Sequence, residues 1–474
     1  MNESMNIDEF QKEAHKIVDW IADYYRNIES YPVKSTMEAG SLLNKLPQSA
    51  PESGEDFSKI FKDFEQMIIP GVTHWQHPGF FAFFPSNSSY PSLLAELLVS
   101  ALALQCMSWE TSPAATELEE RMMDWLRDLW SLPKNWSGVI QDTASTSTLL
   151  ALLSAREKAS EFCVNEKGFY DHSSMRIYAS QEAHSSVEKA AKVLGFGREN
   201  FIKIPTLSDL SMNTLLLKKQ IADDKRNGMQ PTAIVAALGT TSTTAFDDLS
   251  KIAEIAQEEK IWLHVDAAYA GSAFILPELR HYLKGVEAVD SMVINPHKWF
   301  FTHFDCSAYF VKDPSILVRS LEILPEYLKA QSSQNVKNYR DWGLALGRRF
   351  RALKLWFVMR SMGLETIREH IRTHIQLAQH FEKTLLTQNQ SWKIVCPSTL
   401  NLVCFRWHDE KLSPEALDKK NEQFIKALNA TGKFYLSHTR VEGRYTLRFV
   451  AGQRLMEKRH VDDLLQSLQD LIVR

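Results

Sequence analysis

The chain has 474 residues, of which 44% are hydrophobic and 24% are charged, and this composition is ordinary for a globular protein. Its formal net charge of -4 gives no electrostatic basis for binding nucleic acid or an anionic membrane surface. No apolar run approaches the roughly 20 residues that span a bilayer, and the polar start of the chain does not resemble a signal peptide. We therefore expect a soluble protein with no nucleic-acid or membrane partner.

The five cysteines are widely spaced, odd in number and without a Cys-x-x-Cys pair. This pattern suggests neither a disulfide framework nor a zinc site. The histidines between His264 and His303 also lack the His-Glu-x-x-His spacing of a metalloenzyme. Reduced thiols fit a cytoplasmic protein, and we expect no metal.

From Ile7 to Ile28, apolar residues recur at a helical period with charges on the other side. The polar, proline-containing stretch up to Asp56 separates this helix from the centre of the chain. The helix packs either on a partner subunit or on its own chain, and the sequence leaves both open.

The stretch from Pro70 to Pro91 is dense in aromatic residues between prolines. Proline interrupts both helices and sheet ladders, so no regular element is expected here. The aromatic residues form a buried wedge or the wall of a pocket for a flat substrate, and the two interpretations are compatible.

A core helix is predicted from Ala114 to Leu129, followed by a short strand or turn at Gly138 to Ile140. The hydroxyl-rich run from Gln141 to Thr148 then leads into a helical stretch from Leu149 to Ser160. Small hydroxyl residues at a helix start are N-caps by default, but they also fit a phosphate-binding helix terminus. No P-loop motif is present.

From Met175 onward, strand and helix patterns alternate, which favours a mostly parallel sheet covered by helices. The predicted strands are Arg176–Ala179, Phe201–Ile204, Ala233–Leu238, Trp262–Val265, Met292–Ile294 and Ser307–Val311. The predicted helices are Ser185–Leu194, Thr214–Asp224 and Leu249–Glu258. Ligands of such sheets bind beyond the carboxyl ends of the strands.

Asp266 and Lys298 both follow predicted strands at that edge. An amine there can form a Schiff base with a carbonyl cofactor, and a carboxylate can hold a proton on the ring nitrogen of the cofactor. Taken alone, Lys298 would more often be a solvated loop lysine.

The polar stretch from Glu322 to Tyr339 is predicted to be an exposed loop, and a loop of this length in a compact domain suggests a lid. From Leu364 to Arg474, helices alternate with short strands, as in a smaller α+β domain; the predicted strands are Ile394–Val395, Leu402–Phe405 and Tyr445–Phe449. We expect three parts: an N-terminal helical segment (1–89), a large α/β domain (90–353) and a small C-terminal α+β domain (354–474).

The segments HVDAAYAG (264–271) and NPHKW (295–299) resemble the group II pyridoxal-phosphate-dependent decarboxylases, and most closely the aromatic-L-amino-acid decarboxylase family. The resemblance covers nearly the whole chain, including VTHWQHPGFFAFFPSNSSYP, SPAATELEERMMDWL, SQEAHSSVEKA, LGTTSTTAFDDL and LGRRFRALKLWF. It implies fold type I, with a mostly parallel seven-stranded central sheet and helices on both faces. It also implies a homodimer with an exchanged N-terminal segment and active sites at the subunit interface.

The resemblance implies a lyase that decarboxylates an L-amino acid to an amine and CO₂ through a quinonoid intermediate. Lys298 would form the internal aldimine with pyridoxal 5'-phosphate, Asp266 would pair with the ring nitrogen, and His184 would stack on the ring. Further cofactor contacts would come from Ala144, Ser145, Thr241, Ser291, Asn295 and His297. Tyr327, on the expected loop, would protonate the carbanion, and it completes the catalytic set of Lys298, Asp266 and His184.

The substrate pocket implied by the resemblance is lined by Trp75, Phe83, Phe84, Pro85, Ser86, Gln105, Met107 and Gly347. Phe83 replaces the tyrosine common in animal members, and Leu104–Met107 replaces a more apolar cross-subunit stretch, so that Gln105 could bond a polar substituent. Gly347 is typical of members that act on aromatic substrates, where histidine decarboxylases tend to have serine. We expect tyrosine, DOPA, phenylalanine, tryptophan or 5-hydroxytryptophan as the substrate.

Three alternatives remain at this stage. A decarboxylation-dependent aldehyde synthase would react with dioxygen in place of a proton, but in the family that change accompanies loss of the loop tyrosine or the stacking histidine, and both are present. A histidine decarboxylase is the second alternative. An inactive dimeric scaffold is the third, and the intact set of cofactor residues argues against it.

Overall fold

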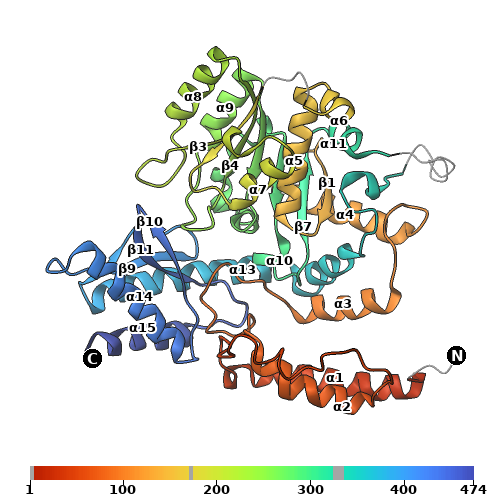
Figure 1. Ribbon diagram of the computed structural model, residues 1–474, viewed down its shortest axis with the longest axis vertical. Helices are drawn as coiled ribbons and strands as arrows, with labels where there is room; N and C mark the ends of the chain where they lie inside the picture. Colours follow the sequence, from red (N-terminus) through yellow and green to blue (C-terminus); the bar gives the residue numbers. More distant parts are fainter. Residues whose placement is uncertain (1–4, 170–173, 324–335, 474) are drawn as a thin grey trace. The chain divides into compact units, whose positions relative to one another are not determined.

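The computed structural model describes residues 5–169, 174–323 and 336–473 (Figure 1). Two compact units are present. The first comprises Met1–Pro85, Phe381–Lys393 and Arg406–Arg474, and the second comprises Ser86–His380 and Ile394–Phe405. The predicted division into residues 1–89, 90–353 and 354–474 stays a prediction. The first compact unit combines nearly all of the first predicted segment with most of the third.

A seven-stranded sheet with the order β1-β7-β6-β5-β4-β2-β3 forms the centre of the second unit. Neighbouring strands from β3 to β6 pair in parallel, whereas β6, β7 and β1 pair antiparallel. The strands are β1 (Ser137–Gln141), β2 (Met175–Ser180), β3 (Phe201–Ile204), β4 (Gln230–Ala237), β5 (Trp262–Asp266), β6 (Ser291–Ile294) and β7 (Ser307–Val311). The predicted mostly parallel seven-stranded sheet is confirmed.

Helices cover both faces of this sheet (Figure 1). One face carries α5 (Ala144–Ala159), α7 (Ser185–Val193) and α11 (Pro314–Leu321), and the other carries α8 (Thr214–Arg226) and α9 (Leu249–Glu259). Because both faces are covered, every residue of β6 and β7 is buried, which explains their continuous apolar sequences. Other α-helices that start within the described residues of this unit are α3 (Tyr90–Leu102), α4 (Pro113–Leu129), α6 (Cys163–Lys167), α10 (Pro296–Trp299) and α13 (Arg351–Gln388).

In the first unit, α1 (Ile7–Arg26) packs through aromatic side chains on the segment that includes α2 (Phe57–Asp63). The Trp20 ring lies 6.2 Å from the ring of Phe61 and 5.2 Å from that of Phe64. The Tyr24 hydroxyl is hydrogen-bonded to His74 Nδ1 at 2.9 Å. No residue of α1 is fully buried, so much of its apolar side is still exposed in one chain.

The C-terminal part contains a four-stranded sheet with the order β10-β11-β9-β8. Its elements are β8 (Trp392–Ile394), β9 (Leu402–Trp407), α14 (Pro414–Ala430), β10 (Ser437–Val441), β11 (Arg444–Val450) and α15 (Lys458–Val473). The predicted α+β character is confirmed, and β10 is an element that the sequence analysis missed. Among the described residues, no helix is both long and apolar enough to cross a membrane.

Candidate active site

The carboxyl ends of β5 and β6 place Asp266 and Asn295 at one edge of the large sheet. Asp266 is the last residue of β5 and is in register with Val293 of β6. The backbone N–H of Asn295 donates to the carbonyl of Ala268 at 2.9 Å, and that of Ala267 donates to Val293 at 3.1 Å. These bonds extend the ladder past both strands and hold the two polar side chains at the same edge.

Lys298 lies one turn further on, in the short helix α10. Its backbone N–H donates to the Asn295 carbonyl at 3.0 Å, and its own carbonyl accepts from Asn87 Nδ2 at 2.7 Å. Burial lowers the pKa of its ammonium, and the Asp266 carboxylate opposes this effect. A larger neutral fraction makes the amine a better nucleophile toward a carbonyl carbon.

His184 is the N-cap of α7, and its Nδ1 accepts from the Ser186 N–H at 3.2 Å. Burial lowers the pKa of His184, Asp266 raises it and Lys298 lowers it. The imidazole therefore lies within electrostatic range of both groups. Because Nδ1 accepts from a backbone N–H, the neutral ring carries its proton on Nε2.

The N-terminus of α5 is open to an anion. Its N-cap residue Thr143 makes no capping hydrogen bond with its side chain, and the N–H groups of Ala144 and Ser145 belong to the first helical turn, where the helix itself supplies no acceptor. Ser147, one turn on, contacts the Ser307 hydroxyl at 3.3 Å, and Ser307 donates to Asn295 Oδ1 at 2.7 Å. The helix start and Asn295 are thus joined, and together they suit a phosphate group.

Thr241 follows β4 at the same edge, in a turn fixed by its neighbours. Gly239 has φ +90°, and a Cβ atom added there would lie 2.4 Å from the Cβ of Ala270. The Thr240 hydroxyl accepts from the Ala245 N–H at 3.1 Å. Thr241 itself is exposed, as a residue that contacts a ligand would be.

The structure does not bring Ser291 to this group of residues. It is the first residue of β6, at the opposite end from Asn295. Its hydroxyl is fully buried and contacts Trp262 Nε1 at 3.0 Å and His264 Nδ1 at 2.9 Å. Four residues of strand span about 13 Å, so the predicted cofactor contact is replaced by a role in the core.

His297 is also held by the fold. Its Nδ1 accepts from the Cys306 N–H at 2.9 Å, and burial lowers its pKa to about 3. Through this hydrogen bond the neutral imidazole stabilises the turn that carries Lys298.

The predicted substrate residues fall into two groups. Gln105, Met107 and Gly347 lie together in the second unit, and a Cβ atom on Gly347 would be 3.3 Å from the Gln105 amide. Ser86 begins the same unit. In the first unit, Trp75 and Phe83 are stacked with ring centres 5.9 Å apart and are 39% and 44% exposed, whereas Phe84 and Pro85 are buried. Tyr327 lies outside the described residues.

The chain matches the model of the pyridoxal-dependent decarboxylase conserved domain over residues 39–408. The chain belongs to this family. It is 42% identical over 478 residues to tryptophan decarboxylase 2 of Oryza sativa subsp. japonica. The aligned region covers 98% of this chain and 95% of the relative. It is 43% identical over 477 residues to phenylacetaldehyde synthase of Petunia hybrida, with 96% and 92% of the two chains covered.

A solved structure supports the same assignment. The crystal structure of Oryza sativa TDC with PLP and tryptamine has a TM-score of 0.96 and 38% identity, and all of both chains is covered. The predicted family, fold, enzyme class and cofactor are confirmed: the protein is a pyridoxal-phosphate-dependent decarboxylase. Its buried amine and open helix terminus fit an aldehyde and a phosphate on one molecule.

Three side chains around this decarboxylase site were not predicted from the sequence: Asn87, Ser147 and Ser307. Asn87 lies in the aromatic Pro70–Pro91 stretch, where its contact with the Lys298 carbonyl could not be foreseen. Ser147 lies in the hydroxyl-rich run, which was the one available signal. Ser307 begins β7 and resembles any other strand residue in the sequence.

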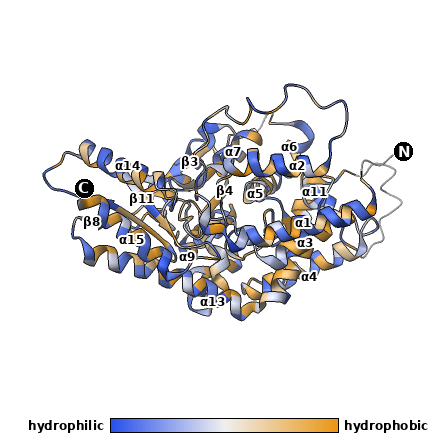
Figure 2. Ribbon diagram, turned by 90° about the horizontal axis from the view of Figure 1, so that it is seen from below, coloured by the Kyte–Doolittle hydropathy of each residue, from blue (hydrophilic) through white to orange (hydrophobic). Residues whose placement is uncertain are grey.

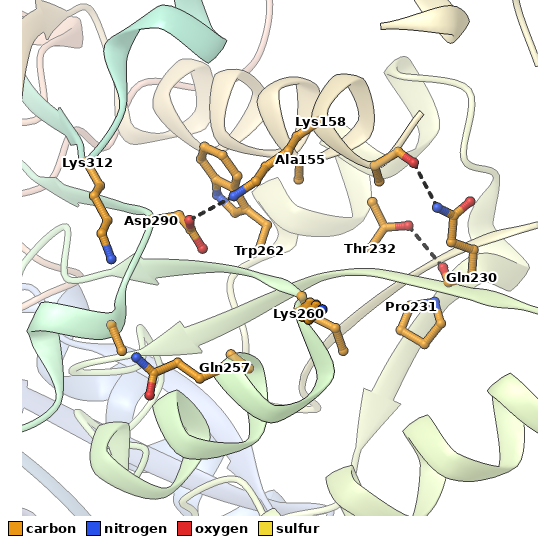
Figure 3. Close-up of a pocket in the computed structure, with 14 residues that line it drawn as sticks. Ala155, Lys158, Gln230, Pro231, Thr232, Gln257, Lys260, Trp262, Asp290 and Lys312 are labelled. Atoms are coloured by element: carbon orange, nitrogen blue, oxygen red, sulfur yellow. Dashed lines mark hydrogen bonds and ion pairs between the residues drawn. The ribbon is translucent and has the colours of Figure 1, made fainter. Parts of the chain in front are cut away.

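The opposite, amino-terminal edge of the parallel strands carries a cavity of about 450 Å³ (Figure 3). Lys158 in this cavity pairs with Asp290 at 3.4 Å, and its ammonium lies 5.2 Å from the Trp262 ring centre. No predicted cofactor or substrate residue lines it. The candidate cofactor residues Asp266 and Asn295 lie instead at the carboxyl edge.

Proposed function

We propose that this enzyme decarboxylates an aromatic L-amino acid to the corresponding amine. The observation that carries the proposal is the geometry of the sheet edge: Asp266 ends β5, and Lys298 lies on α10 directly after the neighbouring strand β6. Support for an aromatic substrate comes from relatives named tryptophan decarboxylase, tyrosine decarboxylase and aromatic-L-amino-acid decarboxylase, each at least 41% identical over nearly the whole chain.

Pyridoxal phosphate, when bound, supplies an electron sink for the pair left by departing CO₂. Lys298 would hold the cofactor through its amine, whose lowered pKa favours the reactive neutral form. Asp266 would keep a proton on the ring nitrogen, and His184 would cover the ring face. The α5 terminus at Ala144 and Ser145 would bind the phosphate, with Asn295 beside it and Thr241 at the rim.

The proposed proton donor to the α-carbon is Tyr327, as the family resemblance implies. Its phenol would deliver the proton that yields the amine, and His184 retains a proton on Nε2 that faces away from Ser186. Tyr327→Phe should lower the yield of amine and raise that of aldehyde and hydrogen peroxide. Unchanged amine output would refute the role given to Tyr327.

The active enzyme is proposed to be a homodimer. On α3, the apolar residues Leu94, Leu97, Leu98 and Leu102 are between 44% and 55% exposed, and on α1 Ile7 and Phe10 are 74% and 56% exposed. Figure 2 colours these helices by hydropathy, and large exposed apolar surfaces of this kind mark contact sites. A second copy would cover them, and each subunit would complete the site of the other with Trp75, Phe83, Phe84, Pro85 and Ser86 or with Gln105, Met107 and Gly347.

The first experiment is product analysis with cofactor-loaded protein and a panel of the aromatic amino acids, histidine, DOPA and 5-hydroxytryptophan. We expect CO₂ and an equal amount of aromatic amine. Release of CO₂ from histidine alone would overturn the aromatic assignment. The cytoplasmic location stays a prediction, to be checked by fractionating cells of the source.

An aldehyde synthase is the second candidate, because a phenylacetaldehyde synthase is 43% identical to this chain. Such an enzyme would consume dioxygen and release peroxide with the aldehyde. Retention of both His184 and Tyr327 favours the amine. The ratio of peroxide to CO₂ in the same assay separates the two, with a value near zero for the decarboxylase.

A further inference from the structure

Two segments that are far apart in the sequence run side by side in the second unit. The Arg340 N–H donates to the Met107 carbonyl at 2.8 Å, and the Cys106 N–H donates to the Arg348 carbonyl at 3.0 Å. The segment 338–348 therefore determines how residues 105–107 are presented.

The Gln105 amide has one defined orientation in this arrangement. Its Oε1 accepts from the backbone N–H of Arg348 at 3.2 Å, although the two residues are 243 positions apart. Since only the amide oxygen can accept this bond, the Nε2 donors point elsewhere. Gln105 is exposed, and within the described part of the chain no acceptor contacts Nε2.

Gly347 makes room for this amide. A Cβ atom there would be 3.3 Å from both Nε2 and Oε1 of Gln105, which is closer than ordinary van der Waals contact. A side chain at this position would require the amide to move by a few tenths of an ångström, so Gly347 favours the observed placement of Gln105.

The side chain of Arg348 is held in place by a buried ion pair. Its Nη2 donates to Glu119 Oε1 at 2.7 Å and to the Ile140 carbonyl at 2.9 Å. The Arg348 and Glu119 side chains are only 6% and 3% exposed, and the guanidinium carbon lies 4.8 Å from the Tyr339 ring centre. Charge-assisted bonds in a buried setting fix geometry more firmly than exposed pairs do.

We propose that Gln105 recognises a hydroxyl substituent on the ring of the aromatic substrate through its Nε2 donors, and that Glu119 and Arg348 are positioning residues that orient its amide. This inference rests on the proposed function and extends it to a substituent class. The hydroxyl oxygen on the ring of tyrosine, DOPA or 5-hydroxytryptophan can accept a hydrogen bond from Nε2. Phenylalanine and tryptophan have no ring hydroxyl.

The test compares matched substrate pairs on the holoenzyme: tyrosine with phenylalanine, and 5-hydroxytryptophan with tryptophan. Gln105→Met keeps the length of the side chain but removes the donors. We expect the kcat/KM ratio of hydroxylated to plain substrate to fall about threefold to tenfold in at least one pair, as for one lost neutral hydrogen bond. The control Gln257→Met, at an exposed site at the opposite sheet edge, should leave both ratios unchanged.

A double-mutant cycle tests the positioning role. Arg348→Lys keeps the charge but loses the planar fork, and it should lower the same ratio in the wild-type background but not in the Gln105→Met background. Arg372→Lys, which alters the exposed pair with Glu278, is the matched control. Equal effects of Arg348→Lys in both backgrounds would overturn the positioning role. If Arg348→Lys does not fold, Glu119→Gln takes its place in the cycle.

The outcomes separate the two proposals. No CO₂ from any aromatic substrate with the wild-type enzyme refutes the proposed function. If the wild-type enzyme is active and Gln105→Met leaves the substrate ratios unchanged, only the recognition role of Gln105 is refuted. The decarboxylase assignment is unaffected.

Discussion

His264 should make the stability of this enzyme fall in mild acid. It lies two residues before Asp266 on β5, is fully buried, and contacts the Ser291 hydroxyl at 2.9 Å. Burial lowers its pKa from the ordinary 6.5 to about 4. Between these two values the unfolded chain binds a proton that the folded chain excludes, so the free energy of unfolding decreases as the pH falls from 6.5 to 4.

The size of this effect follows from the two pKa values. A fall from 6.5 to about 4 corresponds to about 3 kcal/mol of stability lost between neutral pH and pH 4. His264→Gln retains a group that can bond Ser291 but does not titrate. The variant should be less stable than the wild type at pH 7.5, and the difference should shrink or reverse toward pH 4.

The assay is urea unfolding of the holoenzyme at fixed protein and cofactor concentrations, at several pH values between 7.5 and 4. His438→Gln, at an exposed site on β10, serves as the control and should follow the wild type at every pH. Parallel pH curves for wild type and His264→Gln would refute the reasoning, because they would mean that His264 titrates alike in both states.

Three further outcomes are expected. Lys298→Ala should abolish CO₂ release. The variant should also lose the visible absorbance of the bound cofactor on dialysis, because the amine that holds the cofactor is missing. Retained turnover would exclude the role proposed for this amine. Gly239→Ala should destabilise the fold by about 2 to 4 kcal/mol in urea unfolding, because it combines positive φ with a Cβ atom 2.4 Å from that of Ala270; Gly54→Ala, in open space, is its control. Leu98→Glu on α3 should shift the mass measured by light scattering from dimer to monomer, and an unchanged mass would place the subunit contact elsewhere.

The sheet could be predicted because most of its strands are buried on both faces and all are short runs of β-favouring residues. Phe201–Ile204 and Ser307–Val311 match the structure at both ends, since each is a short β-favouring run bounded by turn residues. The edge that carries Asp266 and Asn295 followed from the rule for parallel sheets. β10 was missed because its residues, Ser437 to Val441, are mostly polar and only partly buried.

The errors arise where spacing along the chain differs from distance in space. Ser291 was added to the cofactor contacts from the family resemblance, but it begins β6, so the strand places it at the opposite end from Asn295. The helical pattern was clear only from Leu149, with the hydroxyl-rich run expected to open the helix, and α5 begins at Ala144. Hydroxyl residues fit both a cap and a first helical turn, so the sequence could not fix this boundary.

The pair Gln105–Gly347 shows what a sequence can and cannot say about specificity. The glutamine was visible as a departure from an apolar stretch, and its possible bond to a polar substituent followed from its chemistry. Which end of the amide is free depends on a backbone N–H 243 positions away. That N–H belongs to Arg348, whose side chain forms a buried ion pair with Glu119 on α4. In the proposed role of Gln105, residue identity therefore indicates a preference for a polar ring substituent, and the fold narrows this preference to substituents that can accept from Nε2.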